Sequence, residues 1–145
     1  MKLVVDSNIV IAGILRDSIT RKILYHPLFS FYIPDYSFVE IDRHMDELVE
    51  KSGLTKHRFH QVIDKVKDNF TIIPEQEFNG KYPKALELMC EIDEADAPFI
   101  ALALSFDNDG IWSNDAHFEK QNQVRIWTTK DLIEELRELD EALHY

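Results

Sequence analysis

Two carboxylates directly follow apolar segments that have the composition of buried strands. Asp6 comes after Leu3-Val4-Val5, and Asp115 comes shortly after Ile111-Trp112. Both acids have serine and asparagine neighbours, which are Ser7-Asn8 and Ser113-Asn114. An acid in such a position is a turn residue, a helix cap, or a functional group kept despite the cost of burying a charge. Two carboxylates brought close together repel, and they either take up protons or bind a cation.

A second pair of acids, Asp93 and Asp96, precedes an almost wholly apolar segment. On a helix through this segment, Asp96 lies near the stripe that contains Ile100 and Leu104, so its carboxylate is expected on the inner side of the helix start. Aspartate is also a favoured N-cap, and acids in a first helical turn complement the helix dipole. Capping and a functional role therefore both stay open for each acid of this pair.

The elements that must position these acids alternate between short apolar runs and segments of helical periodicity. Strands are predicted at 3–5, 29–33, 70–73, 111–112 and 124–127. Helices are predicted from residue 7 or 8, over 18–26, 36–51, 55–69, 82–92 and 95–106, and from a capping box at Thr128 and Asp131 to residue 143. This alternation predicts an α/β fold, with a central parallel sheet of about five strands between two layers of helices. Since the carboxyl ends of parallel strands share one edge, where ligands bind, Asp6 and Asp115 are expected there if their strands are neighbours.

Length and composition indicate a single globular domain over residues 1–145, with 45% hydrophobic residues. The formal charge is −11, from 16 basic and 27 acidic residues. Such a charge argues against a general nucleic-acid coat protein, because non-specific affinity comes from Lys and Arg. Cys90 is the only cysteine and is expected to be a packed thiol. We expect a cytoplasmic protein without a membrane segment, since no secretory leader and no run of about 18 apolar residues is present.

Four segments together resemble a known family. In chain order they are VVDSNIVIAG, IPDYSFVEI, DEADAPFIALAL and IWSNDAHF. The series is similar to the PIN-domain family of metal-dependent nucleases, which includes the VapC-like toxins of toxin–antitoxin pairs. The similarity extends from Lys2 to about Leu132. It also singles out Glu40, which periodicity alone would leave in solvent on the helix over 36–51.

The resemblance implies a set of site residues, a cofactor and a reaction. The catalytic acids it implies are Asp6, Glu40, Asp96 and Asp115. The implied ligands of Mg²⁺ or Mn²⁺ are Asp6, Asp96 and Asp115, with Asp93 as an additional or substitute ligand. The implied supporting polar residues are Ser7, where the family often has threonine, Asn8 and Ser113. The implied function is endoribonuclease action on single-stranded RNA, in the setting of a toxin, with an antitoxin protein and a second copy of the chain as expected partners.

Substrate binding must overcome the negative charge of the chain. Removing the charges of the four catalytic acids from −11 still leaves −7, so a local basic patch is needed. Arg16, Arg21 and Lys22 follow the Asp6 segment closely and are expected to flank the same edge.

Two other classes of function stay open. One is a PIN-like protein-binding module without catalysis. The other is an aspartate-based phosphoryl-transfer domain, although Asn8 stands where phosphatases of that kind have a second aspartate.

Overall fold

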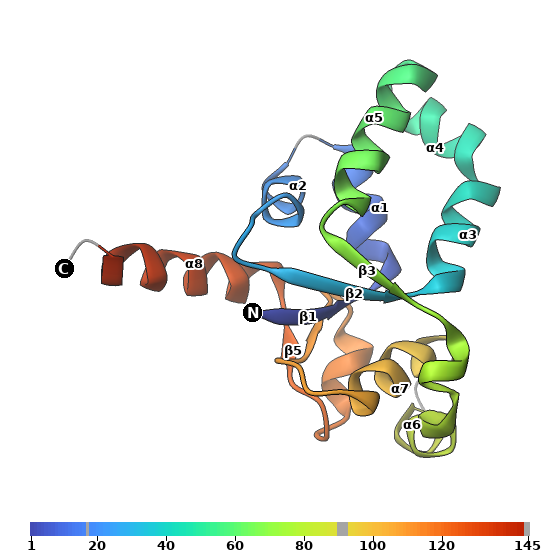
Figure 1. Ribbon diagram of the computed structural model, residues 1–145, viewed down its shortest axis with the longest axis vertical. Helices are drawn as coiled ribbons and strands as arrows, with labels where there is room; N and C mark the ends of the chain where they lie inside the picture. The colour runs from blue at the N-terminus through green and yellow to red at the C-terminus, as the bar shows by residue number, and fades with distance from the viewer. Residues whose placement is uncertain (17, 90–92, 144–145) are drawn as a thin grey trace.

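A five-stranded, wholly parallel sheet forms the centre of the protein (Figure 1). The computed structural model describes residues 1–16, 18–89 and 93–143. The strands are β1 (Lys2–Val5), β2 (Ser30–Pro34), β3 (Phe70–Ile73), β4 (Ile111–Trp112) and β5 (Ile126–Trp127), in the spatial order β3-β2-β1-β4-β5. The predicted fold class is confirmed, and each predicted strand is present.

Helices cover both faces of the sheet, as Figure 1 shows. One layer contains α1 (Ser7–Leu15), α2 (Ile19–Leu24), α3 (Asp35–Arg43), α4 (Met45–Ser52) and α5 (Lys56–Lys67), and the other contains α6 (Tyr82–Met89) and α7 (Ala97–Ser105). The last helix, α8 (Thr129–Leu143), extends away from the sheet towards the C-terminus. The described residues also form the short 3₁₀ segments η1 (Glu75–Glu77), η2 (Asn79–Lys81), η3 (Glu94–Asp96) and η4 (Ala116–Lys120). The core lies between the layers, where Leu3, Val4 and Val5 are completely buried.

The strand order changes direction between β1 and β4, which makes this place a topological switch point of the sheet. The chain first proceeds outward from β1 to β2 and β3, and then returns through α6 and α7 to place β4 on the other side of β1. Val4 is in register with Ile111 and Val5 with Trp112, and the Asp6 N–H donates to the Trp112 carbonyl at 3.1 Å. Ligands bind at such a switch point in open α/β sheets. The segments that carry Asp6 and Asp115 therefore leave the sheet side by side.

The prediction of one continuous helix over 36–51 is wrong. The helix breaks at His44, which has φ −101° and ψ 16°, and the chain continues as α4, which packs against α1. Apolar residues keep their helical spacing across the break, so periodicity could not reveal it.

Helix termini largely follow the predictions. The Thr128–Asp131 capping box is confirmed, because each residue's backbone N–H donates to the other's side-chain oxygen, at 3.0 and 3.1 Å. The segment predicted as a helix from 95 begins instead with η3, before α7. Cys90 and the predicted helix end at 92 lie outside the described residues. In the parts of the chain that the structure describes, every helix is too short or too polar to cross a bilayer.

Candidate active site

Asp6 is a buried carboxylate at the carboxyl end of β1. It is the N-cap of α1, and its Oδ1 accepts a hydrogen bond from the Asn8 backbone N–H at 3.2 Å. Its Oδ2 accepts from the Ser113 hydroxyl at 2.9 Å. Only 4% of Asp6 is exposed. Burial raises the pKa of Asp6, the hydrogen bonds from Ser113 and Asn8 act to lower it, and the charge of Asp115 raises it further.

Ser113 joins Asp6 to the second acid of the sheet edge. Its hydroxyl, which donates to Asp6, also accepts from the Asp115 backbone N–H at 3.0 Å. The Oδ1 of Asp115 in turn accepts from the His117 backbone N–H at 3.0 Å, and so caps η4. A single buried hydroxyl therefore fixes the relative positions of the segments that follow β1 and β4.

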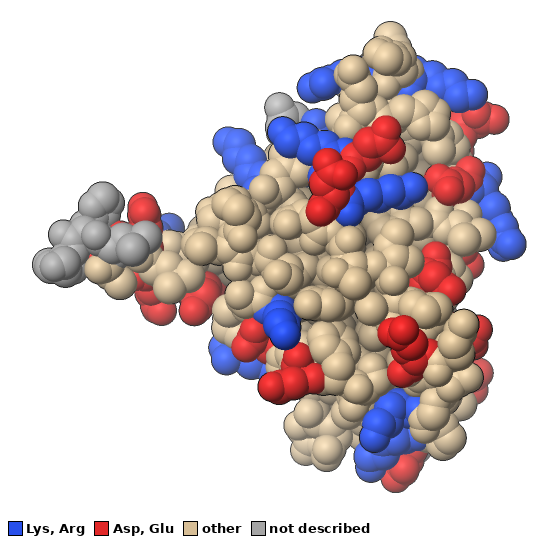
Figure 2. All heavy atoms as spheres, in the orientation of Figure 1, with Lys and Arg blue, Asp and Glu red and all other residues tan. Residues whose placement is uncertain are grey.

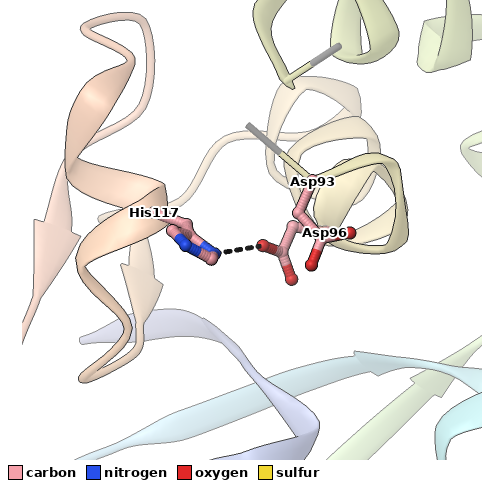
Figure 3. A group of neighbouring side chains, drawn as sticks. All are labelled: Asp93, Asp96 and His117. Atoms are coloured by element: carbon pink, nitrogen blue, oxygen red, sulfur yellow. Dashed lines mark ion pairs between the residues drawn. The ribbon is translucent and has the colours of Figure 1, made fainter. Parts of the chain in front are cut away.

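Asp93 and Asp96 differ in what their carboxylates do. Asp93 caps η3, because its Oδ1 accepts from the Ala95 backbone N–H at 2.9 Å. Asp96 precedes α7 without a side-chain capping bond. Instead it faces His117, as Figure 3 shows, with 3.9 Å between Asp96 Oδ2 and His117 Nδ1. His117 Nδ1 also lies 3.5 Å from Asp115 Oδ1, so three acids and one imidazole gather at this place.

Among the acids that the structure describes, Asp96 has the most strongly raised pKa. Burial, followed by the charges of Asp93, Asp115 and Asp6, raises the pKa of Asp96 to about 6, and His117 acts weakly in the opposite direction. Two atoms of this cluster, Asp96 Oδ2 and His117 Nδ1, are buried without a hydrogen-bond partner. Buried polar atoms in native proteins are nearly always satisfied. A cation between these side chains would satisfy both atoms and favour the charged carboxylate.

The donor set fits a divalent metal. One oxygen of Asp93, one oxygen of Asp96 and one ring nitrogen of His117 lie within 4.8 Å of one another. Among the described residues, these three form the one group of histidine, cysteine or acidic side chains whose ligand atoms lie this close together. The residues present are therefore of the kind, and at the separations, that hold a metal ion.

Glu40 lies at the rim of the site. It is exposed on α3, and its charge acts on Tyr36, as do the charges of Asp6 and Asp96. Burial is the largest cause of the raised pKa of Tyr36, so its phenol stays protonated near these acids. Glu40 also lines a groove of about 320 Å³. Ser7 and Ser37, whose hydroxyls are hydrogen-bonded at 2.9 Å, line the same groove.

Of the three basic residues expected at the sheet edge, Arg21 has its guanidinium engaged by backbone carbonyls. Arg21 is buried, and its guanidinium donates to the carbonyls of Gly13 and Ile14 at 2.7 and 2.8 Å. It therefore stabilises the end of α1 and is not available to a substrate. Arg16 and Lys22 are exposed, but α1 has nine residues and carries the chain about 14 Å away from Asp6 before Arg16 is reached.

Two residues that contact this site were not among the predicted site residues. For His117, its place close to Asp115 in IWSNDAHF was the available signal. Ser37, which pairs with Ser7, carried no signal, because a serine one turn into a helix is ordinary. Of the supporting residues, Ser113 binds two acids, Asn8 contributes its backbone N–H, and Ser7 contacts Ser37.

The fold and the site define a doubly wound α/β domain with an acidic cluster at its topological switch point. The family model of the PIN domain matches residues 4–137, so the chain belongs to the PIN-domain family. Members of this family are generally metal-dependent nucleases. No curated protein gives a significant match to the chain.

Proposed function

We propose that this protein is a metal-dependent endoribonuclease that hydrolyses phosphodiester bonds of single-stranded RNA in the cytoplasm. The observation that supports this most strongly is the buried, unsatisfied Oδ2 of Asp96, whose pKa is raised by three further acids at the switch point. Carboxylates held so close favour bound divalent cations at neutral pH. An acidic cluster of this kind suits phosphoryl chemistry better than a purely structural role, for which a hydrophobic contact would serve.

The proposed ligands of Mg²⁺ or Mn²⁺ are Asp6, Asp96 and Asp115, supplemented by Asp93. A bound ion would stabilise negative charge on the phosphate and lower the pKa of a water molecule. Ser113 holds Asp6 and Asp115 in fixed orientation through its two hydrogen bonds. Glu40, exposed at the rim, has the freedom to accept a proton or to orient a water molecule from the solvent side.

Substrate recognition must rely on local features, since the chain carries −11. Figure 2 shows Lys and Arg side chains over α4 and α5, interspersed with acids on the same face. The groove beside Glu40 is also lined by Ser7, Ser37 and Lys51, and Lys51 forms an ion pair with Glu47 at 2.8 Å. Single-stranded RNA, whose unpaired bases can enter grooves, is the substrate that this arrangement favours. Arg16 and Lys22 stay candidates for contacts with more distant phosphates.

The proposal is tested by cleavage of a transcript pool with mapped ends, using the full chain with Mg²⁺ or Mn²⁺. The variants Asp6→Asn and Asp96→Asn should lose most cleavage, because asparagine is a neutral and weaker oxygen ligand. Asp64→Asn, at an exposed position on α5, is the matched control and should cleave like the parent. Equal cleavage by all three variants would refute the nuclease site.

The two other classes give different results in the same experiment. A binding module without catalysis would stay folded and cleave no RNA in the pool at any metal concentration. A phosphoryl-transfer domain would trap phosphate on Asp6 when it is incubated with a phosphoryl donor, which mass spectrometry of the intact chain detects.

The toxin setting rests on the resemblance to VapC-like proteins. Expression of the parent chain should then arrest growth, whereas Asp96→Asn should not. The antitoxin and the homodimer stay predictions. Co-purification of a small protein from the native host would support the antitoxin, and light scattering measures the mass of the purified particle.

A further inference from the structure

The side chains of Asp96 and His117 face each other, and His117 Nδ1 also lies 3.5 Å from Asp115 Oδ1. Asp96 Oδ2 and His117 Nδ1 lie 3.9 Å apart, and both are buried without a hydrogen-bond partner (Figure 3). A buried polar atom without a partner costs about 1–3 kcal/mol. Two such atoms directed at each other indicate that a third partner belongs between them.

The separations suit a metal ion in that position. Oxygen and nitrogen ligands lie about 2.1 Å from a small divalent cation, so two ligands of one ion are about 3.0 Å apart at a right angle and about 4.2 Å apart on opposite sides. The observed 3.9 Å lies between these values. One oxygen of Asp93 lies within 4.8 Å of one oxygen of Asp96 and one ring nitrogen of His117, and Asp93 keeps one carboxylate oxygen outside its capping bond.

His117 is held in place by its own backbone. Its N–H donates to Asp115 Oδ1 at 3.0 Å, and η4 begins there. The imidazole is 46% exposed, which leaves solvent access to the site while Nδ1 itself is buried. The backbone of His117 is therefore fixed by local structure, and its ring directs one nitrogen towards the acids.

We propose that His117 Nδ1 is a direct ligand of the catalytic cation, together with Asp96 and Asp93, and that this nitrogen makes the position selective for a first-row transition ion over Mg²⁺. Imidazole favours such ions, whereas Mg²⁺ favours oxygen ligands. The inference rests on the proposed metal-dependent function and specifies which ion that function uses. The competing interpretation is a charged His117 that only forms ion pairs with Asp96 and Asp115.

Electron paramagnetic resonance of bound Mn²⁺ distinguishes these interpretations without measuring activity. In the full chain, pulsed spectra should show nitrogen hyperfine coupling that changes when histidine is labelled with ¹⁵N. The variant His117→Asn places an amide near the position of Nδ1 and should abolish the coupling. Its Mn²⁺ affinity should fall at least about 10-fold, since even indirect partners of a metal contribute that much. Its Mg²⁺ affinity, measured by competition, should change less than its Mn²⁺ affinity.

His57→Asn, at an exposed position on α5, is the matched control and should leave the spectrum and both affinities unchanged. Bound Mn²⁺ without nitrogen coupling in the parent chain would overturn the proposal, and this measurement does not depend on any variant folding. An Asp96→Asn variant that binds Mn²⁺ as tightly as the parent would instead contradict the metal centre of the proposed function. The two failures are therefore distinguishable.

Discussion

Replacing Asp96 by asparagine should stabilise the metal-free protein above pH 6, although we expect the same change to remove the proposed RNA cleavage. The reason is the pKa of Asp96, which is raised from 3.8 to about 6, chiefly by burial and then by the neighbouring acids. In the folded state the charge is therefore disfavoured, whereas the unfolded chain ionises this group freely. Asparagine keeps the shape and has no charge to bury.

The size of the effect follows from the same values. A difference of about two pKa units corresponds to about 3 kcal/mol at 1.36 kcal/mol per unit. Because the side chain is 14% exposed, solvent screens part of this, and we expect about 1–2 kcal/mol. The contribution of Asp96 to stability is fully present below pH 3.8 and is lost as the pH rises to about 6. The variant should therefore match the parent at pH 4 and exceed it at pH 7.5.

Urea unfolding with a chelator at pH 4, 6 and 7.5 measures this difference. A saturating ion should reverse the order, because a ligand at about 100 times its Kd adds about 2.7 kcal/mol to the parent alone. Asp64→Asn is the control and should stay within about 0.5 kcal/mol of the parent at every pH. If Asp96→Asn is less stable than the parent at pH 7.5 without metal, the carboxylate stabilises the fold through His117 and the reasoning is refuted.

Three further substitutions test the structural supports of the site. Ser113→Ala removes the hydroxyl that joins the two acids at the sheet edge, and Mn²⁺ affinity by calorimetry should fall about 10–100-fold; unchanged affinity would show that the hydroxyl does not orient them. Arg21→Met leaves two carbonyls at the end of α1 without their donor, and urea unfolding should show that the free energy of unfolding falls by about 2–3 kcal/mol. Lys22→Ala, next to Arg21 on α2, is the control and should lower the free energy of unfolding by less than about 0.5 kcal/mol. Gly110 has φ +125°, and Gly110→Ala forces a β-carbon into the backbone carbonyl of Arg125, so the melting temperature should drop by at least about 4 °C. An unchanged melting temperature would contradict the close approach of these two backbones.

The sheet could be predicted because its strands are short, apolar and bounded by turns. The run at β1 is buried on both faces, which is why it lacks the alternation of a half-exposed strand. Strand order was not encoded in any local pattern. The pairing of β1 with β4 depends on the return of the chain through α6 and α7. From the sequence, the meeting of Asp6 and Asp115 could be predicted only if these two strands were assumed to be neighbours.

The parts of the site that could be anticipated were those fixed by this pairing. Asp6 and Asp115 had to meet once β1 and β4 were neighbours. His117 depends on the 3₁₀ turn of η4, whose side-chain directions have no periodic signature. The prediction that Arg21 flanks the sheet edge was wrong for a related reason. Arg21 is close to Asp6 in sequence, but α1 lies between them, and the guanidinium binds a carbonyl at the end of that helix.

In the acids of this site, helix capping does not exclude the proposed role in binding a cation. Asp6 and Asp115 each use one oxygen to cap the segment that follows, and this fixes their side chains at the sheet edge with further lone pairs free. Asp96 lacks such a bond, although it directly precedes α7. It therefore depends most on an external partner, which agrees with its unsatisfied Oδ2 and its raised pKa. We infer that Asp96 is the residue around which the cation site is organised, and that the capped acids on either side set its shape.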